Sequence, residues 1–388
     1  MAILGDYIRI KHGFAFKGDY ITTDDNGVVL VTPGNFEIGG GFKEKKCKFF
    51  SAEYPDEYVL HAGDLIVTMT DLSKQGDTLG YSALVPDSSR TYLHNQRIGL
   101  VDVFNPEADK HYIYWFLRSA RYQKTIVATA SGSTVKHTSP SRICEVEVSL
   151  PPIDEQRRVA SVLDVIEKRI QNNNQINDNL QQQASALFAK YYEQADSTVP
   201  FTSIIQILGG GTPKTGNLQF WDGAIPFFTP KDVGNPYTLT TEKTITEDGL
   251  AHCNSRLYPI NTVFVTARGT VGKVGLPGVT MAMNQSCYAL LGKELDQLLV
   301  YFYTLRTVQA LKHKASGAVF DAITTRDFES ETIRWLADDH AAAFLSVARP
   351  MYERILNNSI ENMRLATLRD TLLPRLMSGE VDVSDIQL

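Results

Sequence analysis

The sequence predicts an α+β protein in which two similar α/β domains are joined by two long antiparallel coiled-coil helices. Three observations predict this fold class. The 388-residue chain repeats one series of landmarks. Each copy of the series ends in a long helical stretch with a heptad pattern, and each apolar seam contains two asparagines at matching positions. Duplication of a globular domain plus a helix implies a pseudo-two-fold arrangement with two similar surfaces at a fixed separation.

The first domain, residues 1–153, is predicted to contain short strands, turns and one helix. Val28–Val31 and Leu65–Val67 are β-branched runs bounded by Gly, Asp or Pro, which is typical of strands. Tyr112–Lys124 has apolar residues at helical spacing and therefore predicts the helix.

The second domain, residues 196–337, repeats this order. Thr262–Thr266 corresponds to the strand that begins at Leu65, and Leu299–Leu311 corresponds to the helix. Two short motifs also recur, Asn95-Gln96 as Asn284-Gln285 and Ala130-Ser131-Gly132 as Ala315-Ser316-Gly317. The loops between these landmarks differ in length and content, as expected of a shared scaffold that binds two different targets.

The long helices are predicted at residues 154–195 and 338–388. Asp154–Tyr192 contains no Gly or Pro and would span about 58 Å at 1.5 Å per residue. Its 3-4 seam consists of Leu163, Ile166, Ile170, Asn173, Asn177, Leu180, Ala184 and Leu187. The second seam consists of Met351, Ile355, Asn358, Asn362, Leu365, Leu372 and Leu376, and Pro350 is predicted to start that helix.

The seam asparagines are predicted to set the register of the two helices. Asn358 and Asn362 follow Asn173 and Asn177 at an offset of 185 residues. A buried asparagine costs stability unless it is paired, and pairing across an antiparallel coiled coil would satisfy all four amides. Two alternatives remain open: each helix packs only on its own domain, or the asparagines face solvent.

Composition excludes several classes of protein. A hydrophobic content of 43% and a charged content of 21% are typical of a globular protein, and no apolar run approaches the roughly 18 residues of a membrane span. The four cysteines form no CxxC pair and have no histidines at zinc spacing, so we expect free thiols in the cytoplasm and no bound metal. The net charge of −6 argues only mildly against DNA binding, because basic residues cluster locally.

No catalytic, cofactor or metal site is predicted, but both domains have polar and basic loops suited to DNA. Arg and Lys bind guanine or phosphate, and Asn and Gln bind adenine. For any one of these residues taken singly, a solvated surface role is the alternative. The candidates in the first domain are Lys17, Lys45, Lys46, Thr70, Lys74, Gln75, Asn95, Gln96, Arg97, Lys136 and His137, and those in the second are Lys214, Lys231, Arg268, Thr270, Lys273, Asn284, Gln285 and Arg326.

Several motifs, in this order, resemble the specificity subunits of type I restriction-modification systems. They are GFAFK at 13–17, LPPIDEQRRVA at 150–160, GGTP at 210–213, TPKD at 229–232 and LRDTLLPRLMSGE at 368–380. The likeness covers essentially the whole chain. The second junction, Trp335–His340, lacks the Pro-Pro and Glu-Gln of the first, which leaves open whether both helices bind partners equally.

The resemblance implies a non-catalytic subunit with two target-recognition domains. Such a subunit reads a bipartite double-stranded DNA target and binds two methylation subunits, which recruit the restriction and translocation subunits. S-adenosylmethionine, ATP and magnesium then belong to the partners, and this chain binds no cofactor. A protein scaffold with a coiled coil and a tandem ligand-binding protein are the alternatives.

Overall fold

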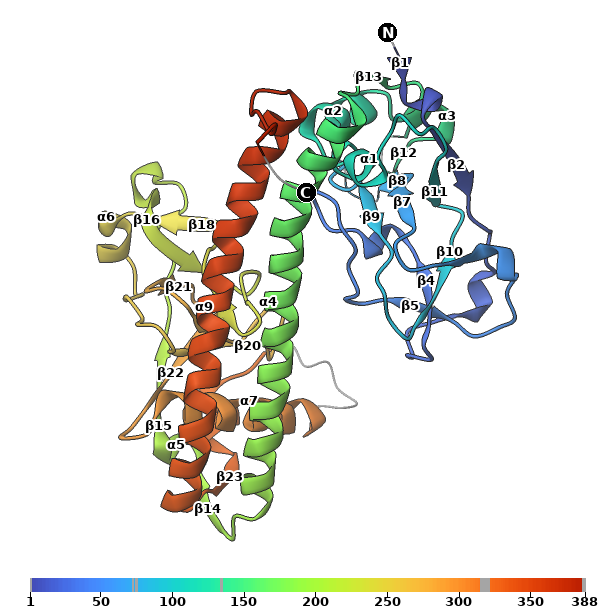
Figure 1. Cartoon of the computed structure of the whole chain (residues 1–388). Helices are drawn as coiled ribbons and strands as arrows, with labels where there is room; N and C mark the ends of the chain where they lie inside the picture. The colour runs from blue at the N-terminus through green and yellow to red at the C-terminus, as the bar shows by residue number, and fades with distance from the viewer. Residues whose placement is uncertain (1, 72, 74–75, 133–134, 315–321, 386–388) are drawn as a thin grey trace. The chain divides into compact units, whose positions relative to one another are not determined.

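The structure is a computed structural model that describes residues 2–71, 73, 76–132, 135–314 and 322–385 (Figure 1). The chain divides into two compact units. Unit 1 comprises Met1–Arg169 and Leu365–Leu388, and unit 2 comprises Ile170–Arg364. Each unit therefore contains one globular domain and a part of each long helix. The motif Ala315-Ser316-Gly317 and the candidates Lys74 and Gln75 lie outside the described residues.

The domain in unit 1 is built on two sheets. The four-stranded sheet has the order β2-β11-β7-β9, and the five-stranded sheet has the order β3-β5-β4-β10-β6. Their strands are β2 (Ile8–His12), β3 (Ile21–Thr22), β4 (Val28–Val31), β5 (Lys48–Phe50), β6 (Val59–Leu60), β7 (Leu65–Thr68), β9 (Ser82–Leu84), β10 (Thr91–His94) and β11 (Ile98–Val103). Two smaller pairs join β1 (Ala2–Ile3) to β13 (Glu147–Val148) and β8 (Thr70–Asp71) to β12 (Lys136–His137).

The domain in unit 2 repeats this topology. Its five-stranded sheet has the order β15-β22-β19-β20-β17, its three-stranded sheet has the order β18-β16-β21, and β14 pairs with β23 as β1 pairs with β13. The strands are β14 (Ser197–Pro200), β15 (Ile205–Gly209), β16 (Trp221–Phe228), β17 (Tyr237–Thr238), β18 (Lys243–Ile245), β19 (Val263–Thr266), β20 (Val274–Pro277), β21 (Ala282–Met283), β22 (Cys287–Gly292) and β23 (Thr332–Trp335). The duplication predicted from the sequence is confirmed.

The described part of each domain contains more helices than the single helix predicted from the sequence. Unit 1 contains α1 (Lys110–Phe116), α2 (Ala120–Ala128) and α3 (Pro140–Cys144), and unit 2 contains α5 (Phe201–Ile204), α6 (Glu247–Ala251), α7 (Gln297–Lys314) and α8 (Thr325–Glu329). The prediction of one continuous helix over Tyr112–Lys124 was wrong. Its interruption has a local cause, because the Ser119 hydroxyl accepts the backbone N–H of Tyr122 and thereby caps a new helix.

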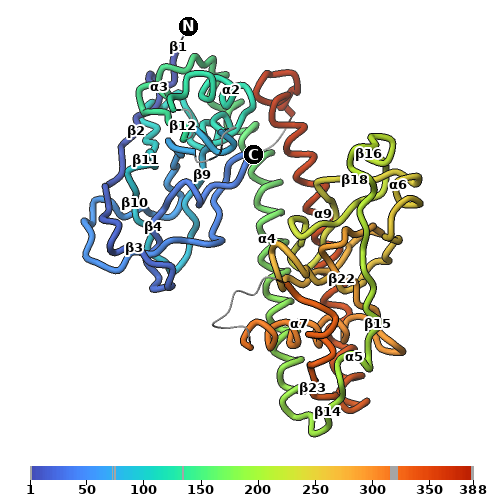
Figure 2. The backbone as a smooth tube through the Cα atoms, turned by 180° about the vertical axis from the view of Figure 1, so that it is seen from behind, coloured from blue at the N-terminus to red at the C-terminus, as the bar shows by residue number. Residues whose placement is uncertain are grey.

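The long helices α4 (Ile153–Glu193) and α9 (Asp338–Met377) run side by side in Figures 1 and 2. The prediction that Pro350 starts the second long helix was wrong. Pro350 lies inside α9, which begins at Asp338. A proline inside a helix removes one backbone hydrogen bond. The helix nevertheless continues, because the flanking residues Phe344, Ala348 and Tyr352 are buried in the core of unit 2.

The two helices pair antiparallel within each unit. In unit 2, Asn173 donates to Asn362 at 2.9 Å and Asn358 donates to Asn177 at 2.8 Å. In unit 1, Arg369 donates to Glu167 at 2.8 Å. The expectation that all four amides are satisfied was wrong in one detail, because the Oδ1 atom of Asn173 is buried without a hydrogen-bond partner.

The helices also pack on the domains, but each contributes to the cores of both units and not only to its own domain, as the alternative interpretation expected. Leu163, Leu373 and Leu376 belong to the core of unit 1, and Ala184 and Phe188 belong to the core of unit 2. The buried face thus serves both the helix pair and the domain, which explains why it is wider than a two-residue heptad seam.

Candidate nucleic-acid interface

A parallel strand pair places two loops at one edge of each domain. In unit 1, β4 and β10 are parallel with Val31 opposite His94, so the loop after β4 and the turn after β10 leave the same edge. In unit 2, β16 and β21 are parallel with Phe228 opposite Met283. Each edge therefore carries two candidate-bearing segments that are far apart in the sequence, those with Lys45 and Gln96 in unit 1 and those with Lys231 and Gln285 in unit 2.

The turn after the second parallel strand has the same construction in both units. In unit 1 the Asn95 side chain accepts the backbone N–H of Arg97 at 3.1 Å. In unit 2 the Asn284 side chain accepts the N–H of Ser286 at 3.0 Å. The two asparagines therefore shape the turns. The exposed side chains of Gln96 and Gln285 follow directly.

A glycine lies against the backbone of each turn. A Cβ atom on Gly13 would lie 2.2 Å from the Asn95 carbonyl oxygen, and one on Gly210 would lie 2.2 Å from the Asn284 carbonyl oxygen. The chain is held there by hydrogen bonds from the N–H of Phe14 to His94 O at 2.8 Å and from the N–H of Gly211 to Met283 O at 3.0 Å. Sequence reasoning did not assign this role, although both glycines stand at the start of recognised motifs.

The loop after β7 forms a second part of the interface in unit 1. The buried Asp71 carboxylate accepts hydrogen bonds from the backbone of Ser73 and from the backbone and hydroxyl of Thr78. Burial raises the pKa of Asp71, but these hydrogen bonds outweigh it, and the net effect is a lowered pKa. Asp71 is therefore ionised at neutral pH, and its carboxylate holds Ser73 and Thr78 through these hydrogen bonds.

Three candidates beside this loop differ in their exposure to solvent. Thr70 is only 4% exposed, and its hydroxyl lies 3.1 Å from the Nδ1 atom of exposed His137. Of the described candidates in unit 1, Thr70 is the least accessible to a ligand. Lys136 is half-buried opposite Asp71 in the β8–β12 pair.

The corresponding loop in unit 2 is organised by Thr266. Its buried hydroxyl donates to Thr270 O, and the backbone N–H of Lys273 donates back to that hydroxyl at 2.9 Å. The Arg268, Thr270 and Lys273 side chains are all exposed. A rigid backbone with outward donors is suited to contacting phosphates and base edges.

The other candidates are distributed around the same loops. Gln285 accepts a hydrogen bond from the Thr212 hydroxyl, which connects the turn to the segment preceding Lys214. Lys231 lies 3.7 Å from Glu242, and both side chains are exposed. Among the described residues, six further candidates are exposed and form no ion pair: Lys17, Lys45, Lys46, Arg97, Lys214 and Arg326.

The described residues contain no group of three or more His, Cys, Asp or Glu side chains placed to hold a metal. The four cysteines are free, and burial raises the pKa values of the Cys47, Cys144 and Cys287 thiols. Within the described part of the chain, no helix is both long enough and apolar enough to cross a membrane.

Comparison with known proteins gives these edges a context. The family described as "Type I restriction modification DNA specificity domain" matches residues 3–182 and again 197–334. The chain belongs to this family. The two matches correspond to the two copies of the repeated topology, so each copy is one specificity domain.

Two relatives of the chain are also named as specificity subunits. The subunit of type I restriction enzyme MjaIX from Methanocaldococcus jannaschii is 22% identical over 302 residues, which cover 71% of this chain and 70% of the relative. The HindI subunit from Haemophilus influenzae is 22% identical over 455 residues, and this match covers 89% of this chain and 99% of the relative. Among solved structures, the S subunit from M. genitalium has the same fold, with a TM-score of 0.61 at 14% identity over 96% of this chain and 94% of that one.

Proposed function

We propose that this chain is the non-catalytic specificity subunit of a type I restriction-modification complex and reads a bipartite double-stranded DNA target. Residues 1–153 would read one half-site and residues 196–337 the other. The observation that carries this proposal is that the turns at Asn95 and Asn284 have one backbone construction but different surrounding side chains. Two copies of one scaffold with different contact residues are suited to two different half-sites.

The partners follow from the family. The specificity subunit would bind two methylation subunits along the helices at 154–195 and 338–388, and these would recruit the restriction and translocation subunits. S-adenosylmethionine, ATP and magnesium would be bound by the partners. In this proposal Asn173, Asn177, Asn358 and Asn362 fix the register of the helix pair on which the partners assemble.

A DNA-binding experiment distinguishes this function from a protein scaffold and from a tandem ligand-binding protein. The full chain, alone and with its methylation subunit, is titrated with duplexes that contain the methylated sites of the host. We expect a specific complex whose affinity falls as salt rises, because lysine and arginine side chains that bind phosphates release the counterions held by the DNA. Absence of binding in both forms would reject the proposal.

Arg268→Ala and Lys273→Ala are expected to weaken DNA binding without loss of the fold. Both side chains are exposed, and the loop backbone is held by Thr266 instead. Loss of a base contact should cost about 1–3 kcal/mol and relax one position of the target, whereas loss of a phosphate contact should weaken all sequences alike. Thr270→Ala tests the third exposed side chain of this loop and should also keep the fold, because the loop uses the backbone carbonyl of this residue. Wild-type binding by both charge variants would remove this loop from the interface.

Exchange of one domain is expected to change one half-site only. Replacement of residues 200–337 by the equivalent domain of a relative leaves the first domain and both helix seams in place. Sequencing of methylated sites before and after the exchange measures both half-sites at once. Simultaneous change of both half-sites would contradict independent reading.

A further inference from the structure

A buried arginine connects the first recognition domain to the long helices within unit 1. Arg118 follows α1 and is 5% exposed, with its guanidinium 4.3 Å from the centre of the Trp115 ring. Its Nε atom donates to the carbonyl oxygen of Gly39 at 2.8 Å, and Nη1 donates to the Tyr114 hydroxyl. Nη1 also lies 3.7 Å from the carboxylate of Glu167 on α4. The same side chain therefore contacts a loop and a long helix.

The carboxylate of Glu167 extends this contact to the second long helix. Its Oε2 atom accepts a hydrogen bond from Nη1 of Arg369, on α9, at 2.8 Å. The side chains of Glu167 and Arg369 are only 17% and 18% exposed. A buried or largely buried charge is costly without its partner, so these three side chains are expected to keep their arrangement together.

At the other end, Arg118 fixes the loop after β4. Gly40 lies so close that a Cβ atom on it would be 2.6 Å from the Cγ atom of Arg118. The neighbouring Gly41 donates its N–H to Ser82 O at 2.9 Å. The loop continues to Lys45 and Lys46, which are exposed candidates for phosphate contact. Arg118, which contacts Glu167 on α4, therefore holds the start of the segment that leads to these lysines.

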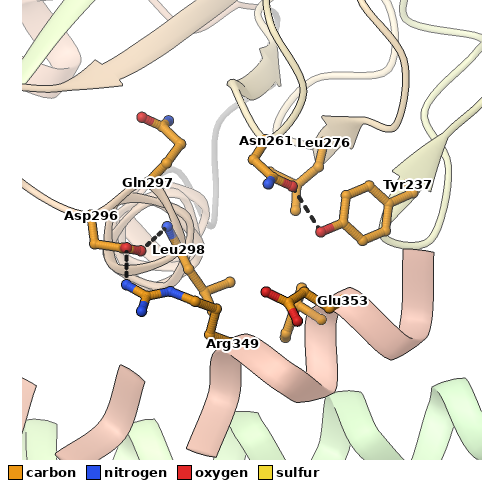
Figure 3. Close-up of a pocket in the computed structure, with 9 residues that line it drawn as sticks. Tyr237, Asn261, Leu276, Asp296, Gln297, Leu298, Arg349 and Glu353 are labelled. Atoms are coloured by element: carbon orange, nitrogen blue, oxygen red, sulfur yellow. Dashed lines mark hydrogen bonds and ion pairs between the residues drawn. The ribbon is translucent and has the colours of Figure 1, made fainter. Parts of the chain in front are cut away.

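Unit 2 has an uncharged contact at the equivalent place. At the 185-residue offset, Tyr352 replaces Glu167 and Ala184 replaces Arg369, and both are buried. Tyr352 packs against Tyr301 with ring centres 5.6 Å apart. Charged contact with α9 occurs instead at the rim of a cavity of about 170 Å³, where Arg349 donates to Asp296 at 2.6 Å (Figure 3).

We propose that Arg118 is a positioning residue for DNA reading by the first recognition domain. It holds residues 37–46 against the helix pair, so that this domain's half-site recognition depends on Glu167 and Arg369. The second domain lacks this dependence, because its equivalent contact is aromatic. The inference rests on the proposed DNA-reading function and deepens it by assigning the helix pair a role in one half-site.

The test compares Arg118→Met with Glu167→Gln in the full chain bound to its methylation subunit. Methionine keeps the stem beside Trp115 but removes the guanidinium, and glutamine removes the charge while it keeps an acceptor for Arg369. Affinity is measured for the intact target and for duplexes with either half-site scrambled. Tyr352→Phe is the matched variant in unit 2, since it preserves the ring.

We expect Arg118→Met to lower affinity for the intact target about tenfold, as loss of a hydrogen bond from a charged group predicts. Glu167→Gln should give a smaller loss at the same half-site, and Tyr352→Phe should give none. When the first domain's half-site is scrambled, all variants should bind like wild type. Hydrogen exchange of the Gly41 amide should accelerate in both unit 1 variants. A general loss of stability would accelerate exchange throughout unit 1 and not only in this loop.

Three results would overturn the positioning role. The first is wild-type affinity for the intact target in both Arg118→Met and Glu167→Gln. The second is an equal loss of affinity through both half-sites, and the third is an unchanged rate of hydrogen exchange at the Gly41 amide in Glu167→Gln. If Arg118→Met unfolds at the assay temperature, Glu167→Gln decides by the same criteria. Failure of the wild-type chain to bind any duplex would instead reject the proposed DNA-reading function, so the two failures are distinguishable.

Discussion

Gly210→Ala is expected to destabilise unit 2 by about 3 kcal/mol, in the upper range for overpacking a well-filled site. The new Cβ atom would lie 2.2 Å from Asn284 O and 2.3 Å from Met283 O. Both obstacles are backbone atoms, so a side-chain rotation cannot relieve the clash. The chain must instead move away from the turn and weaken the hydrogen bond from Gly211 to Met283.

The neighbouring residue supplies a close control. A Cβ atom on Gly209 would meet nothing within 4 Å, so Gly209→Ala should be nearly neutral. Denaturant unfolding measures the difference, and hydrogen exchange of the Gly211 amide localises it in a chain with two units. Gly13→Ala, with Gly18→Ala as its control, should give the same contrast in unit 1. Equal stability of Gly210→Ala and Gly209→Ala would show that the close approach does not constrain the turn.

This contrast also bears on DNA reading. The turns at Asn95 and Asn284 carry Gln96 and Gln285, which are candidates for base contact. If the glycines hold these turns in place, Gly210→Ala should weaken binding through one half-site and Gly13→Ala through the other. A loss of affinity without a loss of stability would assign the glycine to the interface itself.

The fold class could be predicted because its two main signals recur along the chain. The series of landmarks occurs twice, and the apolar residues of the long helices follow a heptad pattern. Burial of Leu163, Asn173 and Ala184 follows the predicted seam. Non-periodic features were harder to predict. The helix break at Ser119 depends on one hydroxyl that caps a backbone amide, and the position of Pro350 inside α9 depends on packing by residues far from it in the sequence.

The types of residue in the candidate interface could be predicted from the sequence, but the burial of each residue could not. The repeated Asn-Gln motif marked equivalent positions in the two copies, and the structure shows that each position is a turn. Thr70 shows what the pattern leaves out, since its neighbours in sequence do not reveal that it is buried beside His137. The network of Arg118, Glu167 and Arg369 was equally hidden, because its members are separated by 49 and 202 residues.

Insertion of one heptad into each long helix is expected to change the spacing between half-sites or abolish binding. We propose insertion after Gln175 in α4 and after Ile360 in α9, which are equivalent at the 185-residue offset. These points lie between the two asparagines of each seam, so the pairs Asn173–Asn362 and Asn177–Asn358 both survive. The inserted heptads would pair with each other and preserve the seam.

Each inserted heptad adds about 10 Å of helix, which is comparable to about three base pairs of DNA. Because a duplex repeats about every 10 base pairs, the two domains would also need to face different positions around the groove. We therefore expect the preferred spacer to lengthen by a small integer, or affinity for every spacer to collapse because no spacer satisfies both distance and phase. Binding to a series of duplexes with increasing spacers measures the change.

Insertion into α4 alone is the control for damage to the helix pair. It displaces Asn173 from Asn362 while Asn177 remains opposite Asn358, so the helices can no longer satisfy both pairs. This variant should lose stability as well as DNA binding. The double insertion should instead have the same free energy of unfolding as the wild-type chain. A double insertion that still prefers the original spacer with undiminished affinity would show that the length of the helices does not set the distance between the two recognition domains.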